Sequence, residues 1–101
     1  MKLFKDLLRF ADKFGIPKIR EIIEAKMNPK ITFMNVVEIA NEAIRFNAQN
    51  LRQKCFDFIL DSVKNQDSLL NIEKLDKDFA FEVFLQAFYR ISETVEKQFY
   101  D

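Results

Sequence analysis

The sequence predicts an all-α fold of tandem helical hairpins with a long C-terminal helix. Apolar residues recur at spacings of three and four along most of the 101 residues, which is the period of amphipathic helices. The chain has one Gly and two Pro, and no segment alternates at period two with β-branched enrichment, so we expect no strands. A weak internal repeat at a shift of 32 residues indicates that the helices come in pairs.

The repeat aligns Gly15 with Asn47 and surrounds both with matching apolar positions. The matched pairs are Leu7 with Ile39, Ala11 with Ala43, Phe14 with Phe46, Ile19 with Leu51 and Ile23 with Cys55. Gly and Asn best tolerate the left-handed conformation that ends a helix. The repeat therefore predicts two helix–turn–helix units, which favour a docking surface over a reaction centre because each unit buries its apolar stripe on its neighbour.

The first hairpin is expected near the N-terminus. An apolar stripe predicts a first helix over about residues 3–14, which Gly15 ends. Pro17 suits the first turn of a second helix, where its missing N–H costs nothing. Asn28-Pro29 ends that helix, because the residue before proline is disfavoured in the helical region.

The second hairpin is expected to follow directly. Thr32 is the predicted N-cap of a third helix that runs from Phe33 to Phe46 and ends at Asn47. A fourth helix follows over residues 51–63.

A short turn and a long helix complete the predicted fold. Ser68 is expected to cap a short helical turn over residues 69–72, and Asp76 to cap the last helix. The seam of that helix is formed by Phe81, Phe84, Phe88, Ile91 and Val95. Its apolar surface is widened by Phe79, Leu85, Tyr89 and Phe99. An apolar surface this wide favours burial on two sides.

Composition argues against an enzyme. The chain has no His, the commonest general base and metal ligand. Cys55 sits on an apolar stripe and is expected to be a small buried hydrophobe and not a reactive thiol. The single Gly15 excludes a glycine-rich phosphate loop. We therefore expect no catalytic residue, no cofactor and no metal.

The charges cancel overall but not by halves. Residues 1–54 hold 11 Lys/Arg against 6 Asp/Glu, and residues 55–101 hold 5 against 10. This split is expected to reflect solvated helix faces, with one basic and one acidic surface as the alternative. A helix-turn-helix nucleic-acid binder would use Lys13, Lys18, Arg20, Arg45 and Arg52. It is disfavoured because the domain has no net basic charge.

The location is expected to be cytoplasmic or nuclear. A lone cysteine gives no intrachain disulfide framework. The N-terminal segment is interrupted by charges and is no signal peptide. No apolar run approaches the roughly 18 residues that would span a membrane.

Two stretches resemble a known pair of domains. LLRFADKFGIPKIREIIEAKM resembles the last two helices of BTB (POZ) domains, and ITFMNVVEIANEAIRFNAQNLRQKCFDFILDSV resembles the start of the BACK domain. LLNIEKLDKDFAFEVF is similar to a later BACK segment. The resemblance implies a division into residues 1–27, the end of a BTB domain, and residues 28–101, a BACK-like domain.

The resemblance implies a function as well. Proteins of this family are substrate adaptors of cullin-3 ubiquitin ligases. Their BTB domain dimerises and binds cullin, and the first BACK hairpin extends the cullin-binding groove. A separate domain captures the substrate. The BTB strands and dimerising N-terminal helix are absent, so a fragment of a larger adaptor is implied. The implied partners are the N-terminal region of cullin-3 and either a second copy or the rest of the parent chain, with no nucleic acid and no membrane.

The sequence offers two candidate contact surfaces. The family's cullin groove would run near Met27, Pro29, Ile31, Phe33, Met34 and Val37. Among these, the first and last fit a core, whereas Phe33 and Met34 either complete the core or receive a partner helix. The second surface, for an oligomer or interdomain contact, comprises Phe81, Phe84, Phe88, Ile91, Val95 and Phe99. It supports an alternative function, a helical homo-oligomerisation module without cullin binding.

Overall fold

The computed structural model describes the backbone of residues 2–100 and the side chains of residues 2–89. Its helices are α1 (Lys2–Lys13), α2 (Pro17–Met27), α3 (Val36–Arg45), α4 (Gln49–Asn65) and α5 (Lys77–Tyr100). Two 3₁₀ turns, η1 (Asn28–Lys30) and η2 (Ile72–Lys74), lie in the connections. Residues 2–100 contain no strand, so the predicted all-α class is confirmed.

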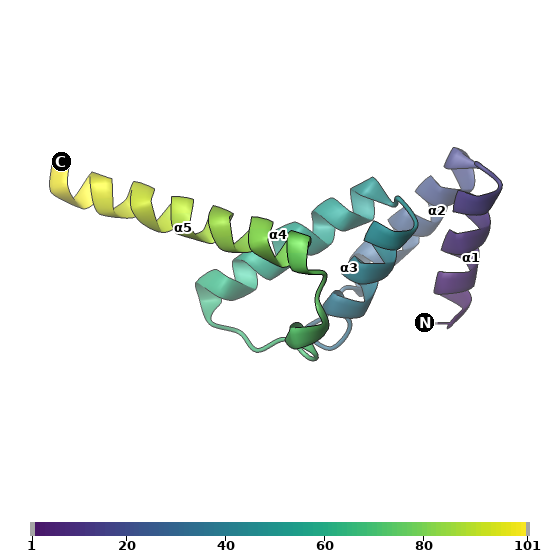
Figure 1. Cartoon of the computed structure of the whole chain (residues 1–101), viewed down its shortest axis with the longest axis horizontal. Helices are drawn as coiled ribbons and strands as arrows, with labels where there is room; N and C mark the ends of the chain where they lie inside the picture. The colour runs from purple at the N-terminus through teal and green to yellow at the C-terminus, as the bar shows by residue number, and fades with distance from the viewer. Residues whose placement is uncertain (1, 101) are drawn as a thin grey trace.

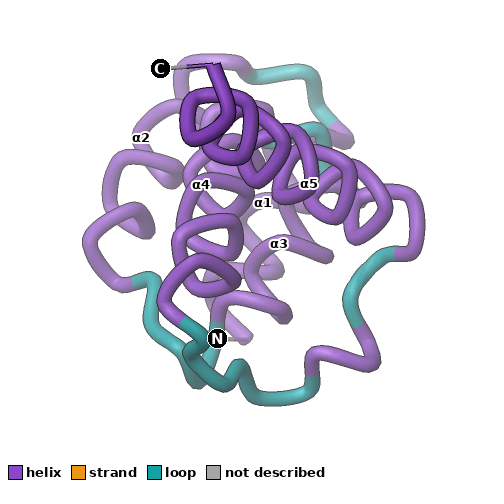
Figure 2. Tube along the Cα trace, turned by 90° about the vertical axis from the view of Figure 1, so that its left-hand side faces the viewer, coloured by secondary structure: helices purple, strands orange, loops and turns teal. Residues whose placement is uncertain are grey.

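The molecule is elongated, with extents of 53 × 24 × 23 Å. Helices α1 and α2 lie at one end, and the C-terminal half of α5 projects from the other end (Figure 1). Between them α3 packs on α4, α2 also contacts α4, and α5 crosses α4. The connection from α4 to α5 runs along the outside of the bundle in both views (Figure 2).

Both predicted turn residues adopt the left-handed conformation. The φ angle is 59° at Gly15 and 58° at Asn47. The next residue closes each turn in the same way, because the Ile16 amide donates to the Ala11 carbonyl and the Ala48 amide to the Ala43 carbonyl. These bonds satisfy carbonyls that the helix ends leave open. Gly15 and Asn47 therefore end their helices with the same turn geometry.

One buried core joins α1–α5 and their connections. Phe79, Leu8, Ile39, Leu51, Ile59, Val36 and Cys55 are the largest fully buried side chains. Cys55 thus takes the predicted role of a small core residue. Burying side chains of this size contributes about 1.5–3 kcal/mol each.

A carboxylate from α2 caps the N-terminus of α4. Ala48 precedes α4 and provides no side-chain cap. The buried Glu24 carboxylate instead accepts the Leu51 amide at 2.7 Å. This residue is in the first turn of α4, where an amide has no partner within the helix. The helix dipole also favours a negative charge there.

Two further side chains attach the first hairpin to the α3–α4 turn. Arg20 on α2 donates to the Asn47 carbonyl at 2.9 Å. The Asn47 side chain donates in turn to Asp12 on α1 at 3.2 Å. Helices α1 and α2 therefore both contact the turn that Asn47 forms.

Asn41 on α3 fixes the start of α5. Its amide donates to the Lys74 carbonyl at 2.9 Å, and its oxygen accepts the Asp76 amide at 2.8 Å. Asp76 accepts the Phe79 amide at 3.0 Å, which confirms the predicted cap.

Two predicted boundaries are wrong. Helix α3 begins at Val36 and not near Thr32, because residues 33–35 form a turn closed by side-chain hydrogen bonds. The helical turn before α5 covers Ile72–Lys74 and not residues 69–72. It follows Asn71, whose φ of 59° interrupts helical geometry at that point.

We predict that Glu24→Ala lowers the free energy of unfolding by about 1.5–3 kcal/mol, because a buried charge-assisted hydrogen bond is lost. Glu21→Ala, on the same helix but exposed, is the matched control and should change it by less than about 0.5 kcal/mol. Urea unfolding measures both variants. Equal effects would show that Glu24 does not cap α4.

We also predict that Gly15→Ala lowers the free energy of unfolding by about 1 kcal/mol, the strain of a left-handed alanine. A Cβ at Gly15 meets no atom within 4 Å, so backbone strain is the whole cost. Lys18→Ala, at an exposed helical position, serves as the control. Thermal unfolding that leaves Gly15→Ala as stable as the parent would contradict the turn geometry.

Candidate protein-interaction surface

The connection between α2 and α3 is held by its own side chains. The Asn35 carboxamide oxygen accepts the Thr32 amide at 2.8 Å, and its NH₂ donates to the Lys30 carbonyl at 2.8 Å. Thr32 Oγ1 accepts the Met34 amide at 3.2 Å. Because both ends are bonded, the tip at Phe33 and Met34 has a defined backbone.

Phe33 and Met34 point outward from this tip. Their exposed fractions are 47% and 71%, so neither completes the core. The Phe33 ring nonetheless rests on Phe58 of α4, with ring centroids 5.3 Å apart. Its carbonyl accepts the Leu70 amide at 3.0 Å. Phe33 is therefore exposed on one side and supported on the other, as a contact residue requires.

The other four residues of this predicted site are not equally available. Met27 and Val37 are buried in the core, and Ile31 is half-buried against it. Pro29 is exposed at the start of η1. The structure thus reduces the accessible apolar surface at this connection to Phe33, Met34 and the outer edges of their neighbours.

Apolar residues of the α4–α5 connection enlarge this surface. Leu70 and Ile72 are each about half exposed, like Val63 at the end of α4. An open groove of about 370 Å³ is lined by Ile59, Ser62, Val63, Asp67, Ser68, Leu69 and Ile72. Sequence reasoning missed it because the groove depends on the path of the connection, which carries no periodic pattern.

The second predicted surface is on α5. Phe79 and Val83 are buried and attach the helix to the bundle. Phe81, Phe84 and Phe88 are each more than half exposed. The remaining predicted contacts, Ile91, Val95 and Phe99, lie outside the described side chains.

An exposed stripe on α1 was not predicted. Leu3, Leu7 and Phe10 lie one position before the buried Phe4, Leu8 and Ala11, and Phe14 follows in the turn after the helix; all four are 41–71% exposed. The spacing of four, three and four was visible in the sequence, but the two stripes merge into one apolar face. Only the packing of α1 decides which of them is covered.

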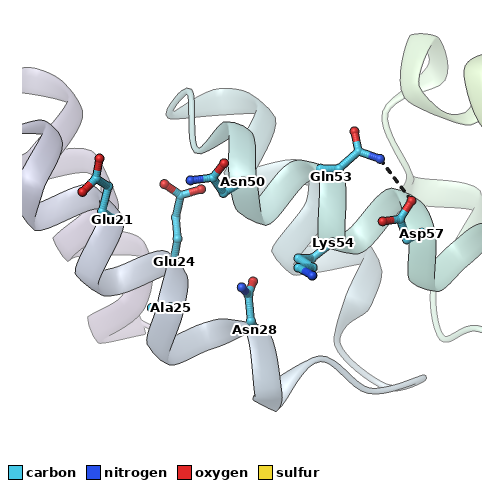
Figure 3. Close-up of a pocket in the computed structure, with 8 residues that line it drawn as sticks. All are labelled: Glu21, Glu24, Ala25, Asn28, Asn50, Gln53, Lys54 and Asp57. Atoms are coloured by element: carbon cyan, nitrogen blue, oxygen red, sulfur yellow. Dashed lines mark hydrogen bonds between the residues drawn. The ribbon is translucent and has the colours of Figure 1, made fainter.

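A polar groove separates α2 from α4 (Figure 3). It measures about 360 Å³ and is lined by Glu21, Glu24, Ala25, Asn28, Asn50, Gln53, Lys54 and Asp57. Glu24 already accepts the Leu51 amide, and Gln53 donates to Asp57 at 3.0 Å. Asn28 Oδ1 is buried there without a hydrogen bond.

The described residues contain no group of three His, Cys, Asp or Glu that could hold a metal ion. Burial raises the pKa of the Cys55 thiol to about 12, which keeps it protonated.

Three of the arginines considered for nucleic-acid binding have partners within the fold. Arg20 donates to Asn47, Arg45 lies 3.8 Å from Glu42, and Arg52 binds Glu82 at 2.9 Å. Arg52 also lies over the Phe79 ring, 5.1 Å from its centroid. Arg20 and Arg52 therefore connect separate elements of the fold, whereas Arg45 pairs within α3.

No helix in the described part of the chain has the length and apolar character needed to cross a bilayer. Comparison with protein-family models, with curated proteins and with solved structures finds no match to this chain.

We predict that Cys55 reacts with a thiol reagent at pH 8 at least about 100-fold more slowly in the folded protein than in denaturant, because thiolate is the nucleophile. Its pKa is higher folded than unfolded, so the unfolded chain loses this proton first. The contribution of the protonated Cys55 thiol to the free energy of unfolding is therefore complete below pH 9. It decreases between pH 9 and pH 12 by up to about 1.4 kcal/mol per pH unit.

The stability difference between the parent and Cys55→Ala should therefore narrow above pH 9. Fast labelling of the folded chain would contradict this burial.

Proposed function

We propose that this chain is a non-catalytic protein-interaction module of a cullin-3 ubiquitin ligase substrate adaptor. In this proposal residues 1–27 are the end of a BTB domain and residues 28–101 are BACK-like. The module contributes to cullin binding and positions a substrate-binding domain. The observation that carries the proposal is the exposed pair of Phe33 and Met34 on a hydrogen-bonded turn.

The position of this pair supports the proposal. The resemblance to BTB-BACK proteins puts the cullin groove beside the connection that carries Phe33 and Met34. A flexible thioether and an aromatic ring suit a groove that receives a partner helix. The ring is supported by Phe58, so contact with a partner would not need a large rearrangement of the backbone.

The open stripe of α1 supports the same proposal. Leu3, Leu7 and Phe10 are exposed along one side of the helix, and Phe14 is exposed in the turn that follows it. In the BTB fold that the resemblance implies, the hairpin of residues 1–27 would rest on a BTB core. Exposed apolar stripes of this length mark surfaces that another structure covers.

The test measures binding of the N-terminal region of cullin-3 to this chain and to a version extended at its N-terminus by a BTB domain. We predict that the extended version binds, and that Phe33→Ala with Met34→Ala weakens it about tenfold or more, because central apolar anchors each contribute more than about 1 kcal/mol. Calorimetry or surface plasmon resonance gives the affinities.

Phe81→Ala is the matched control, because it removes from α5 a Phe that is even more exposed than Phe33, and it should leave the affinity unchanged. An extended version that does not bind cullin-3 would overturn the adaptor proposal. Equal affinity of the parent and the double variant would overturn the assignment of the contact to Phe33 and Met34.

A further inference from the structure

The outer face of α5 is an aromatic stripe with no partner in the bundle. Phe81, Phe84 and Phe88 are 61%, 54% and 54% exposed. The Phe84 ring contacts Phe88 at 4.6 Å between centroids and is stacked on Phe81 at 6.5 Å. Phe79 and Val83, which attach α5 to the bundle, are buried. The stripe is thus continuous over two turns.

The residues that flank the stripe are uncharged. If Phe81, Phe84 and Phe88 are the a, d and a positions of a heptad, the flanking e and g positions are Ala80, Leu85, Ala87, Ser92 and Thr94 in sequence. Helices that select a different partner by charge carry Glu, Lys or Arg at these positions. Glu82, Glu93 and Glu96 fall at b and f positions, and Asp78 is at an e position in the turn before Phe81. A second α5 can therefore approach the stripe from Phe81 to Phe88 without meeting a like charge at the e and g positions between these residues.

The available area is sufficient for a specific contact. From the exposed fractions of Phe81, Phe84, Leu85, Phe88 and Tyr89, two facing stripes would bury roughly 1,000 Å², given about 200 Å² for a full aromatic side chain. Specific interfaces begin at about that size. A pair of this area is expected to be reversible.

We propose that two copies of this chain associate through α5, with the two helices antiparallel about a two-fold axis. The C-terminal half of α5 projects past the bundle (Figure 1). Antiparallel pairing about a two-fold axis at the stripe brings Phe81, Phe84 and Phe88 of the two copies together. The helix dipoles are then opposed, which is the favourable arrangement, and one patch serves both copies. The pairing is independent of cullin binding, which uses Phe33 and Met34.

Sedimentation equilibrium of the whole chain over a hundredfold range of concentration tests the pairing. We expect the mean mass to rise from 12.0 kDa towards twice that value. Phe84→Glu should keep the helical circular dichroism of the parent and weaken association at least tenfold, because it puts two carboxylates in the seam. Phe10→Glu, on the exposed stripe of α1, is the matched control and should still associate.

A single species of 12.0 kDa at every concentration would overturn the proposal and leave this face to another protein or another segment. If Phe10→Glu dissociates the dimer and Phe84→Glu does not, the contact is on α1 and the proposed pairing through α5 is wrong. If this chain is monomeric and its BTB-extended version binds cullin-3, the pairing through α5 is refuted and the adaptor function is not. If this chain forms a dimer and its BTB-extended version does not bind cullin-3, the adaptor function is refuted and the pairing is not.

Discussion

The hydrogen bond from the Leu51 amide to the buried Glu24 carboxylate joins the two halves of this molecule. It is both a helix cap and a tertiary contact, because Glu24 is on α2 and Leu51 is in the first turn of α4. Placing a carboxylate in the interior is costly unless its hydrogen bonds are made. The bond therefore restricts α2 and α4 to positions in which the carboxylate and the amide meet.

The other polar contacts between helices depend on this placement. With α2 held against α4, Arg20 reaches the Asn47 carbonyl and Asn47 reaches Asp12. The same position of α4 brings Arg52 to Glu82 and over the Phe79 ring of α5. Each exposed pair contributes little by itself. Together they connect α1, α2 and α5 to α4 and to the turn that precedes it.

The helices carry more apolar surface than one core can cover. On α1 and α5, one stripe is buried and a neighbouring stripe is exposed. Isolated exposed apolar residues are common on protein surfaces. Two continuous exposed stripes on separate helices, together with the exposed Phe33 and Met34, are more than that background. This distribution fits a module that is completed by other structures.

Local sequence signals predicted much of the fold. Gly15 and Asn47 are left-handed as their residue types indicate, and Asp76 caps α5. The predicted start of α3 at Thr32 is wrong, because Thr32 takes part in a tight turn instead of capping the helix. In that turn its hydroxyl oxygen accepts the Met34 amide and its own amide donates to the Asn35 side chain. The role of Glu24 could not be predicted, because its partner is 27 residues away.

The predicted contact site divides for the same reason. The type and spacing of Met27, Val37, Phe33 and Met34 mark all four as apolar positions, but only packing separates the buried pair from the exposed pair. Periodicity identifies an apolar face and does not say which neighbour covers it. The exposed stripe of α1 could not be predicted for the same reason.

In the proposed complex, the turn carrying Phe33 and Met34 is a preformed contact for cullin-3. Amide hydrogen exchange of the BTB-extended chain can be measured residue by residue with and without the N-terminal region of cullin-3. We expect new protection over residues 31–36 on binding and no change along residues 77–89 of α5. Protection confined to α5, or no change at residues 31–36 in the bound complex, would contradict it.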